Sequence, residues 1–415
     1  MRNTGVFGVA LVFSGGLAAG AAMASPQVVP TGQVTVVAEQ AGGEAGFRGW
    51  LTGFRSRAQV AGIPGAVLDN VLPGLTYQAD VIRRDRNQSE FTKTIWDYLD
   101  TAVSEERVAN GRAALARHRD LLERIEARYG VEKEVVVAIW GLETAYGTFR
   151  GSVPTLDALA TLAHDGRRGA FFEAELLNAL RIVAAGDVAP RAMVGSWAGA
   201  MGHTQFMPSS FLALAQDFNG DGRRDIWGDD PTDGLASAAH YLAHYGWTKG
   251  MPWGVEVVLP QGFDFEQSGE RVRKSTADWL AMGLRGAEGG PLPDHGPASV
   301  LLPGGARGAA FLIFANFQVI ERYNPADAYV IAVGHLADRI RGAGPFRANW
   351  PREERALTRD ERLELQERLT QAGFDTRGVD GRIGPNTIAA IRAFQKAQGL
   401  VPDGFAALSV LTGLR

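Results

Sequence analysis

The chain has 415 residues, of which 46% are hydrophobic and 21% charged, a composition typical of a globular protein with one large or two smaller domains. Its formal net charge of −4 is too small to indicate a nucleic-acid or anionic-membrane partner. Because the sequence contains no cysteine, it excludes disulfides, thiolate metal sites and a cysteine nucleophile.

The first 24 residues have the pattern of a secretory signal peptide. Arg2 gives a basic start, residues 6–22 are small and apolar, and Ala22-Met23-Ala24 has the small-x-small pattern that precedes a signal-peptidase cut. The apolar run is shorter than the roughly 20 strongly apolar residues of a membrane-spanning helix. We therefore expect cleavage after Ala24 and a periplasmic protein with neither a lipid nor a membrane anchor.

Residues 25–45 are expected to form a mobile polar segment, after which the pattern is mainly helical. Apolar residues recur at helical spacing over 112–129, and 131–145 is an apolar run typical of a buried helix. Proline or aspartate stands in the first turn of two more expected helices, 208–218 and 232–245. The remaining helices expected in this body are 155–162, 170–185 and 329–340.

Residues 251–314 differ in pattern from the helical body. Segments 255–259 and 309–314 are apolar, rich in Val, Ile or Phe, and separated by turns rich in glycine and proline. These features predict two strands. We therefore expect a small β-rich insertion in an otherwise helical body.

The C-terminal residues form a separate compact unit in the sequence pattern. Leu363, Leu369 and Ala372 give one helical stripe, and a second stripe begins after Pro385 and ends before Gly399. The sequence thus predicts a mainly α (α+β) fold. Its expected parts are a body over residues 46–342, a linker over 343–356 and a three-helix module over 357–415.

One carboxylate, Glu143, follows an uninterrupted apolar run. Residues 135–139 carry no charge that could pair with it. Loss of hydration disfavours the anion, so we expect a raised pKa for Glu143. A carboxylic acid that stays protonated near neutral pH can act as a general acid. The alternative is a helical glutamate whose tip reaches solvent.

Residues 196–210 combine small residues with Trp, Met and Phe. Such a segment lets the backbone approach a ligand closely while large side chains form the walls of the site. Ser196 and Gln205 would supply neutral hydrogen-bonding groups there. Tight helix packing explains the same composition equally well. A serine-hydrolase elbow is excluded, because Val194 stands where G-x-S-x-G needs its first glycine.

Together, Gly141-Leu142-Glu143-Thr144-Ala145-Tyr146-Gly147 and residues 198–210 resemble the motifs of lytic transglycosylases of the membrane-bound transglycosylase B type, glycoside hydrolase family 103. Residues 217–227 and 322–324 extend the resemblance, which covers residues 46–342 approximately. It implies a lysozyme-like catalytic domain that cleaves the MurNAc–GlcNAc β-1,4 bond of peptidoglycan. It also implies that Glu143 is the single catalytic residue, acting as acid and then as base.

The resemblance implies a reaction without water. Glu143 would protonate the leaving oxygen and then take the proton of the sugar's own C6 hydroxyl, which closes on C1 to leave a 1,6-anhydro-MurNAc end. Ordinary glycosidases instead use two carboxylates. No cofactor is required for this chemistry, and the absence of an H-E-x-x-H motif argues against zinc catalysis.

The resemblance also implies roles for neutral residues that line the cleft. Ser196 matches a residue that supports the glutamate, and Gln205 matches a polar residue on the substrate side. Any tyrosine among the other matches could equally be a core residue with a bonded hydroxyl. These other matches are Tyr241, Tyr323, Asn324 and Tyr329.

The segment 217–225 places oxygen-bearing side chains at alternate positions with a glycine at the sixth, like the start of an EF-hand loop. Gly228 stands where an EF-hand needs its last glutamate, but in the resembled family a longer loop closes with a later aspartate. We expect structural calcium here, with a solvated acidic loop as the alternative. The expected ligands are Asp217, Asn219, Asp221, Asp233 and the backbone carbonyl of Arg223.

Residues 357–413 resemble the peptidoglycan-binding module of many wall hydrolases, through Leu365-Gln366, residues 379–387 and Ala393-Phe394-Gln395. This implies that glycan strands of peptidoglycan are the partner, with other wall enzymes as further candidates. Two rival interpretations stay open. One is a lysozyme-like muramidase that cuts the same bond with water, and the other is a non-catalytic peptidoglycan-binding scaffold.

Overall fold

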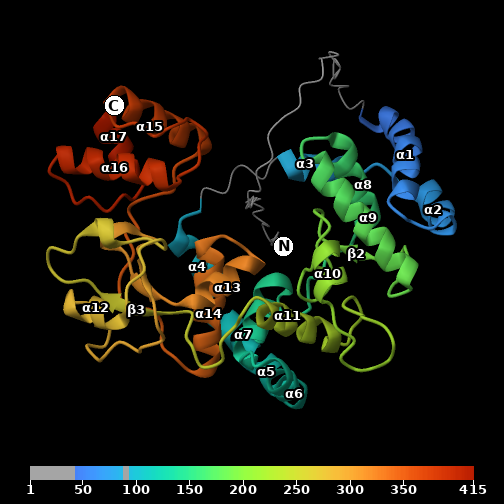
Figure 1. The fold of residues 1–415 in the computed structure, drawn as a ribbon, viewed down its shortest axis with the longest axis horizontal. Coiled ribbons are helices and arrows are strands. Elements are labelled where there is room, and N and C mark those ends of the chain that lie inside the picture. Colours follow the sequence, from blue (N-terminus) through green and yellow to red (C-terminus); the bar gives the residue numbers. More distant parts are fainter. Residues whose placement is uncertain (1–42, 87–92) are drawn as a thin grey trace, which may run out of the picture.

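The computed structural model describes residues 43–86 and 93–415, which form a helical body, a small subdomain with a sheet and a C-terminal helical module (Figure 1). The expected signal peptide and most of the expected mobile segment lie outside the described residues, while residues 43–45 belong to the first helix. No helix of the described part is long and apolar enough to span a membrane.

The body is built from thirteen α-helices among the described residues, which confirms the mainly α expectation. In Figure 1 the helices α1–α3, α8 and α9 lie at one end, the sheet subdomain and the module lie at the other, and α7, α11, α13 and α14 lie between them. The bounds are α1 (Gly43–Val60), α2 (Gly65–Val71), α3 (Ala79–Arg86), α4 (Ile95–Ala102), α5 (Glu105–Arg117), α6 (Arg119–Tyr129), α7 (Lys133–Thr144), α8 (Thr155–Asp165), α9 (Gly169–Ala185), α10 (Pro208–Leu214), α11 (Thr232–His244), α13 (Ala315–Tyr323) and α14 (Asp327–Arg341).

Two helix predictions differ from the structure in detail. The single helix expected over 112–129 is wrong, because His118 (φ −108°, ψ 24°) leaves the helical conformation and separates α5 from α6. The hydrophobic spacing of the two helices runs on through this break, so the pattern did not indicate it. The helix expected over 208–218 ends at Leu214, before the aspartate-rich loop begins.

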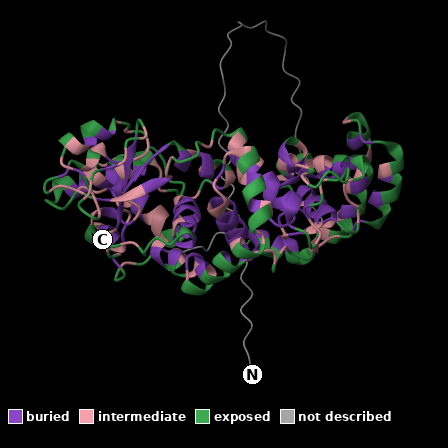
Figure 2. Ribbon diagram, turned by 90° about the horizontal axis from the view of Figure 1, so that it is seen from below, coloured by how far each residue is buried: buried purple, intermediate pink, exposed green. Residues whose placement is uncertain are grey.

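Helix α7 is the buried centre of the body. Every residue from Val135 to Thr144 is buried, because the segment is apolar on all faces. Helices α14 and α5 pack against it, and Figure 2 shows buried ribbon running through the middle of the molecule. This packing places the end of α7, and with it Glu143, inside the protein rather than on its surface.

The subdomain between α11 and α13 contains a four-stranded antiparallel sheet. Its order is β4-β3-β6-β5, with β3 (Gly254–Val258), β4 (Arg285–Gly286), β5 (Ser299–Leu301) and β6 (Ala310–Ile313). The strands expected at 255–259 and 309–314 are thereby confirmed. The strands β4 and β5 were missed because two or three residues carry no measurable alternation. A second small sheet in the body pairs β1 (Val153–Pro154) with β2 (Val194–Gly195).

The C-terminal module has the three helices that the sequence predicts, α15 (Arg359–Gln371), α16 (Pro385–Ala397) and α17 (Leu408–Leu414). Thr358 and Glu361 form a capping box at the start of α15. The module has a hydrophobic core of its own, which includes Leu365, Ile391 and Leu411.

The module is docked on the sheet subdomain through several polar contacts. Asp403 Oδ2 accepts the backbone N–H of Ala306 at 2.8 Å, and Arg392 donates to the Ser268 hydroxyl at 2.8 Å. Lys396 also forms an ion pair with Glu266. The α12 helix (Thr276–Ala281) lies elsewhere in the same subdomain.

The segment 343–356, which joins the body to the module, packs against both the sheet subdomain and the helical body. Glu256 accepts the backbone N–H groups of Arg347 and Ala348, and Arg352 forms an ion pair with Asp100. These contacts hold the middle of the joining segment against both parts.

Candidate active site

Glu143 lies in the last turn of α7, immediately before a backbone turn of left-handed conformation. Ala145 and Tyr146, which follow the helix, have φ angles of 47° and 60°. The phenol of Tyr146 folds back against Gly141, where an added Cβ would lie only 2.6 Å from the ring. Gly141 therefore permits the strained turn that ends the helix beside Glu143.

The carboxyl group of Glu143 is almost completely enclosed. The residue is 3% exposed, its Oε1 accepts a hydrogen bond from the Tyr329 hydroxyl at 2.6 Å, and its buried Oε2 has no hydrogen-bond partner among the described residues. Burial raises the pKa of Glu143 to about 7, while the Tyr329 hydrogen bond favours the anion and opposes part of the rise. The raised pKa predicted from the apolar run is confirmed. Its cause is burial rather than repulsion by a second carboxylate.

Three tyrosines from distant parts of the chain surround this carboxyl group. Burial raises the pKa of Tyr98, Tyr323 and Tyr329 above the usual range, and the charge of Glu143 raises each further. These phenols are therefore neutral at neutral pH. The hydroxyl of Tyr323 donates to the backbone carbonyl of Thr204 at 2.7 Å. Tyr98, on α4, was missed because its helical spacing does not distinguish it from an ordinary core tyrosine.

His203 joins the two sequence segments that were singled out around Glu143 and around residues 196–210. Its Nδ1 accepts the Trp140 indole N–H at 3.1 Å, and its Nε2 donates to the Gly228 carbonyl at 2.9 Å. Thr144 donates its hydroxyl hydrogen to the His203 carbonyl at 2.7 Å. Burial lowers the pKa of His203, which keeps it neutral with its proton on Nε2. Sequence reasoning assigned no role to this histidine.

Gln205 and Ser196 both lie in the segment held by His203. Gln205 is 7% exposed, has a positive φ of 55°, and donates its side-chain amide to the Gly202 and Arg150 carbonyls at 2.9 and 3.2 Å. A non-glycine residue in this conformation is strained, which is common at functional sites. The Ser196 hydroxyl accepts the Ala200 N–H at 3.1 Å. The described contacts of Ser196 do not include Glu143.

The remaining predicted cleft residues lie together beside Thr204. The rings of Tyr241 and Tyr323 are 4.8 Å apart, and Phe206 packs against both. The Tyr241 hydroxyl donates to the Arg322 carbonyl. Asn324, at the end of α13, accepts the Ala326 N–H at 3.1 Å. The structure thus brings Tyr323, Tyr329 and Glu143 together, with Tyr241 adjacent.

The aspartate-rich loop is organised around two carboxylates. Asp217 accepts the backbone N–H groups of Gly220, Asp221 and Gly222 at 2.7–3.1 Å. Asp233, in the first turn of α11 and 1% exposed, accepts the N–H groups of Phe218 and Asp225 at 2.9 Å. The two ends of the loop are thereby fastened together.

The residues of this loop fit a hard cation by donor type. Burial raises the pKa of Asp233, and the nearby charge of Asp217 raises it further, so a cation between them would relieve an unfavourable charge. Carboxylate, amide and carbonyl oxygens are the ligands that calcium prefers. Outside this loop, the described residues include a cluster of three carboxylates whose oxygens lie within 4.8 Å of one another. Its members are Glu270, Glu321 and Asp327.

Comparison with protein families identifies two matching regions. The transglycosylase SLT domain matches residues 46–338, and the putative peptidoglycan binding domain matches residues 358–407. The membrane-bound lytic murein transglycosylase B of Escherichia coli (strain K12) is 36% identical over 250 residues, which are 59% of this chain and 66% of that protein. The chain therefore spans just under two thirds of that relative's length.

Solved structures of similar proteins share the fold. SltB3 from Pseudomonas aeruginosa in complex with NAG-NAM-pentapeptide is 46% identical, has a TM-score of 0.87, and the match covers 89% of this chain and 99% of that one. SltB3 has also been solved in complex with NAG-anhNAM-pentapeptide. The E. coli lytic transglycosylase Slt35 in complex with calcium is 32% identical, with a TM-score of 0.61 and coverage of 70% of this chain and 92% of that one.

Proposed function

The chain belongs to the lytic murein transglycosylases, and we propose that it cleaves the MurNAc–GlcNAc β-1,4 bond of peptidoglycan without water, leaving 1,6-anhydro-MurNAc ends. The relative SltB3 was solved with an anhydro-NAM ligand, which is the kind of product this reaction leaves.

The observation that carries the proposal is the single buried carboxyl group of Glu143. Its pKa of about 7 leaves about half of the molecules protonated at neutral pH, so one group can serve both as the acid and as the base. The free Oε2 is the atom that would deliver the proton to the leaving oxygen. The resulting carboxylate would then accept the proton of the C6 hydroxyl as that oxygen attacks C1. Glycosidases that use water instead pair two carboxylates.

The neighbouring residues would then orient the reacting groups. Tyr329 would hold the Glu143 carboxyl group through Oε1, which leaves Oε2 for the sugar. Gln205, Asn324 and Tyr323 would contact substrate, as polar and aromatic groups near the carboxyl end of α7. Ser196 and Tyr241 would complete this set of cleft residues.

The C-terminal module would bind glycan strands, because residues 358–407 match a peptidoglycan-binding family. We propose a catalytic domain over residues 46–342, a connecting segment over 343–356 and the wall-binding module over 357–415. We also propose that the protein acts in the periplasm, where its substrate lies, and that it is exported with a signal peptide cleaved after Ala24 and carries no lipid anchor. Other wall enzymes are proposed as further partners.

Calcium would be a structural ion rather than a participant in the chemistry. Asp217, Asn219, Asp221 and Asp233, with the carbonyl of Arg223, would hold it. Its charge would offset the negative charges of Asp217 and Asp233, the two carboxylates that accept the backbone N–H groups of the loop. The E. coli relative Slt35 was solved with calcium. The loop lies beside the His203 segment, because Gly228 accepts the His203 N–H.

Mass spectrometry of the fragments released from purified peptidoglycan tests the reaction. We expect muropeptides that end in anhydro-MurNAc, lighter by one water than the product of hydrolysis. Reducing MurNAc ends would make the protein a muramidase. Glu143→Gln should abolish release in a folded protein, whereas lytic activity that survives this change would remove Glu143 from the mechanism.

A further inference from the structure

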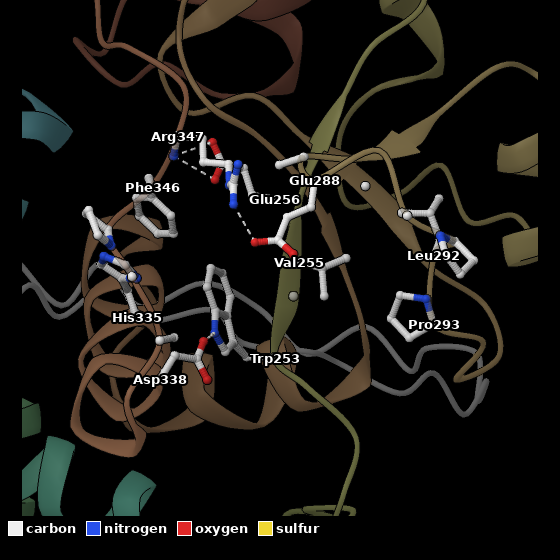
Figure 3. A pocket seen from close by; sticks show the side chains of 18 residues that line it. Trp253, Val255, Glu256, Glu288, Leu292, Pro293, His335, Asp338, Phe346 and Arg347 are labelled. Carbon is white, nitrogen blue, oxygen red and sulfur yellow. Dashed lines mark hydrogen bonds and ion pairs between the residues drawn. The ribbon is translucent and has the colours of Figure 1, made fainter.

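A cavity lies at the far end of α14, against the sheet subdomain (Figure 3). It encloses about 690 Å³, within the range of roughly 300–1,000 Å³ that is usual for ligand sites. Its walls come from the edge of β3, the loop 286–293, the end of α14 and the segment 343–347. Its lining includes none of the residues described around Glu143, and His335, the lining residue of α14 nearest to Tyr329 in sequence, is six residues away, roughly 9 Å at 1.5 Å per residue. The cavity is therefore separate from the Glu143 site.

One wall of the cavity is a fixed aromatic surface. Trp253 donates its indole N–H to Asp338 Oδ2 at 2.9 Å, and its ring lies flat on Gly334, where a Cβ would be 2.4 Å from ring atoms. Phe346 stacks on His335 with the ring centroids 3.7 Å apart and the planes at 18°. Burial lowers the pKa of His335 to about 4, so this stacked pair carries no charge at neutral pH. The surface is formed before any ligand arrives.

The charged groups around the cavity have an excess of negative charge. Its lining contains three carboxylates, Glu256, Glu288 and Asp338, and one guanidinium, Arg347, while a second guanidinium, Arg341, pairs with Asp338 from outside the lining. Arg347 forms an ion pair with Glu288 at 2.6 Å, and the Glu256 carboxylate accepts hydrogen bonds from backbone N–H groups of the joining segment. Asp338 Oδ1 lies 3.4 Å from Arg341, and burial raises the pKa of Asp338 although Trp253 and Arg341 both favour its anion. Figure 3 shows Asp338 beside Trp253 on one side of the cavity, with Leu292 and Pro293 across from them.

We propose that this cavity binds a primary ammonium group carried on an apolar chain. Aromatic faces attract cations and carboxylates accept their N–H groups, while Val255, Leu292 and Pro293 supply an apolar wall for the chain. Resting on the proposed function, the ligand is the free side-chain amine of the diamino acid in a peptidoglycan stem peptide. Cross-linking acylates this amine and removes its charge. The cavity would therefore favour stems that are not cross-linked.

Calorimetric titration of the full chain with two stem tripeptides tests the proposal. One peptide ends in lysine and the other in meso-diaminopimelate, and each is compared with its form acetylated on the side-chain amine. We expect acetylation to weaken binding roughly tenfold, the effect of losing one charge-assisted contact. The peptide with the larger loss identifies the diamino acid. Equal dissociation constants for the free and acetylated forms of both peptides would overturn the proposal.

Two variants locate the binding. Asp338→Asn keeps an oxygen that can accept the Trp253 N–H, and it should remove most of the preference for the free amine. Glu288→Gln, at an exposed position, should weaken binding about two- to threefold by reducing the negative charge. Glu123→Gln, an exposed change on α6 of the helical body, is the matched control and should leave binding unchanged. A preference for the free amine that persists in Asp338→Asn would place the peptide elsewhere.

The probes contain no glycosidic bond, so this experiment is independent of cleavage. If the peptides fail to bind while anhydro ends are still produced, only the amine site is wrong. If cleavage fails while the free amine is still preferred, only the proposed reaction is wrong.

Discussion

Removing the hydroxyl of Tyr329 should move the pH dependence of cleavage to higher pH. This hydroxyl donates to Glu143 Oε1 at 2.6 Å and stabilises the anion. A hydrogen bond to a charged group contributes about 1.5–3 kcal/mol, and one pKa unit corresponds to about 1.36 kcal/mol. Tyr329→Phe should therefore raise the pKa of Glu143 from about 7 by about 1–2 units. At pH 8 the protonated fraction would rise from about one tenth to one half or more.

Initial rates of muropeptide release at low peptidoglycan concentration, measured between about pH 5 and pH 10, test this expectation. The alkaline midpoint should shift upward even though the maximal rate falls, because the variant also loses a group that orients the carboxyl. Tyr323→Phe is the matched control, since its hydroxyl contacts the Thr204 carbonyl instead of Glu143. A midpoint in Tyr329→Phe that stays in place or moves downward would refute the reasoning.

Folding raises the pKa of Glu143 from 4.5 to about 7, so burying this residue lowers the free energy of unfolding increasingly as the pH rises between these values. Glu143→Gln should therefore raise the free energy of unfolding at pH 8.5 by up to about 3 kcal/mol, seen as a higher Tm, and have little effect at pH 4. Calcium at about 10 mM should stabilise chelator-treated protein by about 1–3 kcal/mol if its Kd is on the order of 0.1–1 mM. Asp233→Asn should remove the resulting gain in Tm. An unchanged Tm on adding calcium to the unsubstituted protein would exclude the ion. Deleting residues 357–415 should reduce activity on intact sacculi more than on short soluble glycans, and equal losses would contradict a targeting role.

Features that depend on local pattern could be predicted from the sequence. The apolar run before Glu143 gave both the burial of α7 and the direction of the pKa shift, because both follow from the same absence of charged neighbours. The helical stripes of the module and the two longer strands of the insertion were found for the same reason. The break at His118 was missed, since hydrophobic spacing continues across it.

Contacts between distant residues could not be derived from spacing. Tyr329 was named through a family resemblance, but its bond to Glu143 spans 186 residues of sequence, and only the packing of α14 on α7 creates it. His203 and Tyr98 gave no signal, because a buried histidine and a helical tyrosine are ordinary core residues in a sequence. The docking of the module on the sheet subdomain depends on surface polar groups such as Asp403 and Lys396, which have no periodic pattern.

The surroundings of Glu143 also determine how its titration should be read. Tyr98, Tyr323 and Tyr329 have pKa values raised by burial, so they stay neutral as the pH rises toward 9. His203 has a lowered pKa and is already neutral near pH 7. Glu143 is then the group of this site that changes charge around neutral pH, and cleavage at low substrate should fall along a single alkaline limb with its midpoint near pH 7. A second ionisation between about pH 6 and pH 8 would mean that another group also affects cleavage, either Glu321, whose pKa is raised to about 7 by burial and by Glu270, or a group on the substrate.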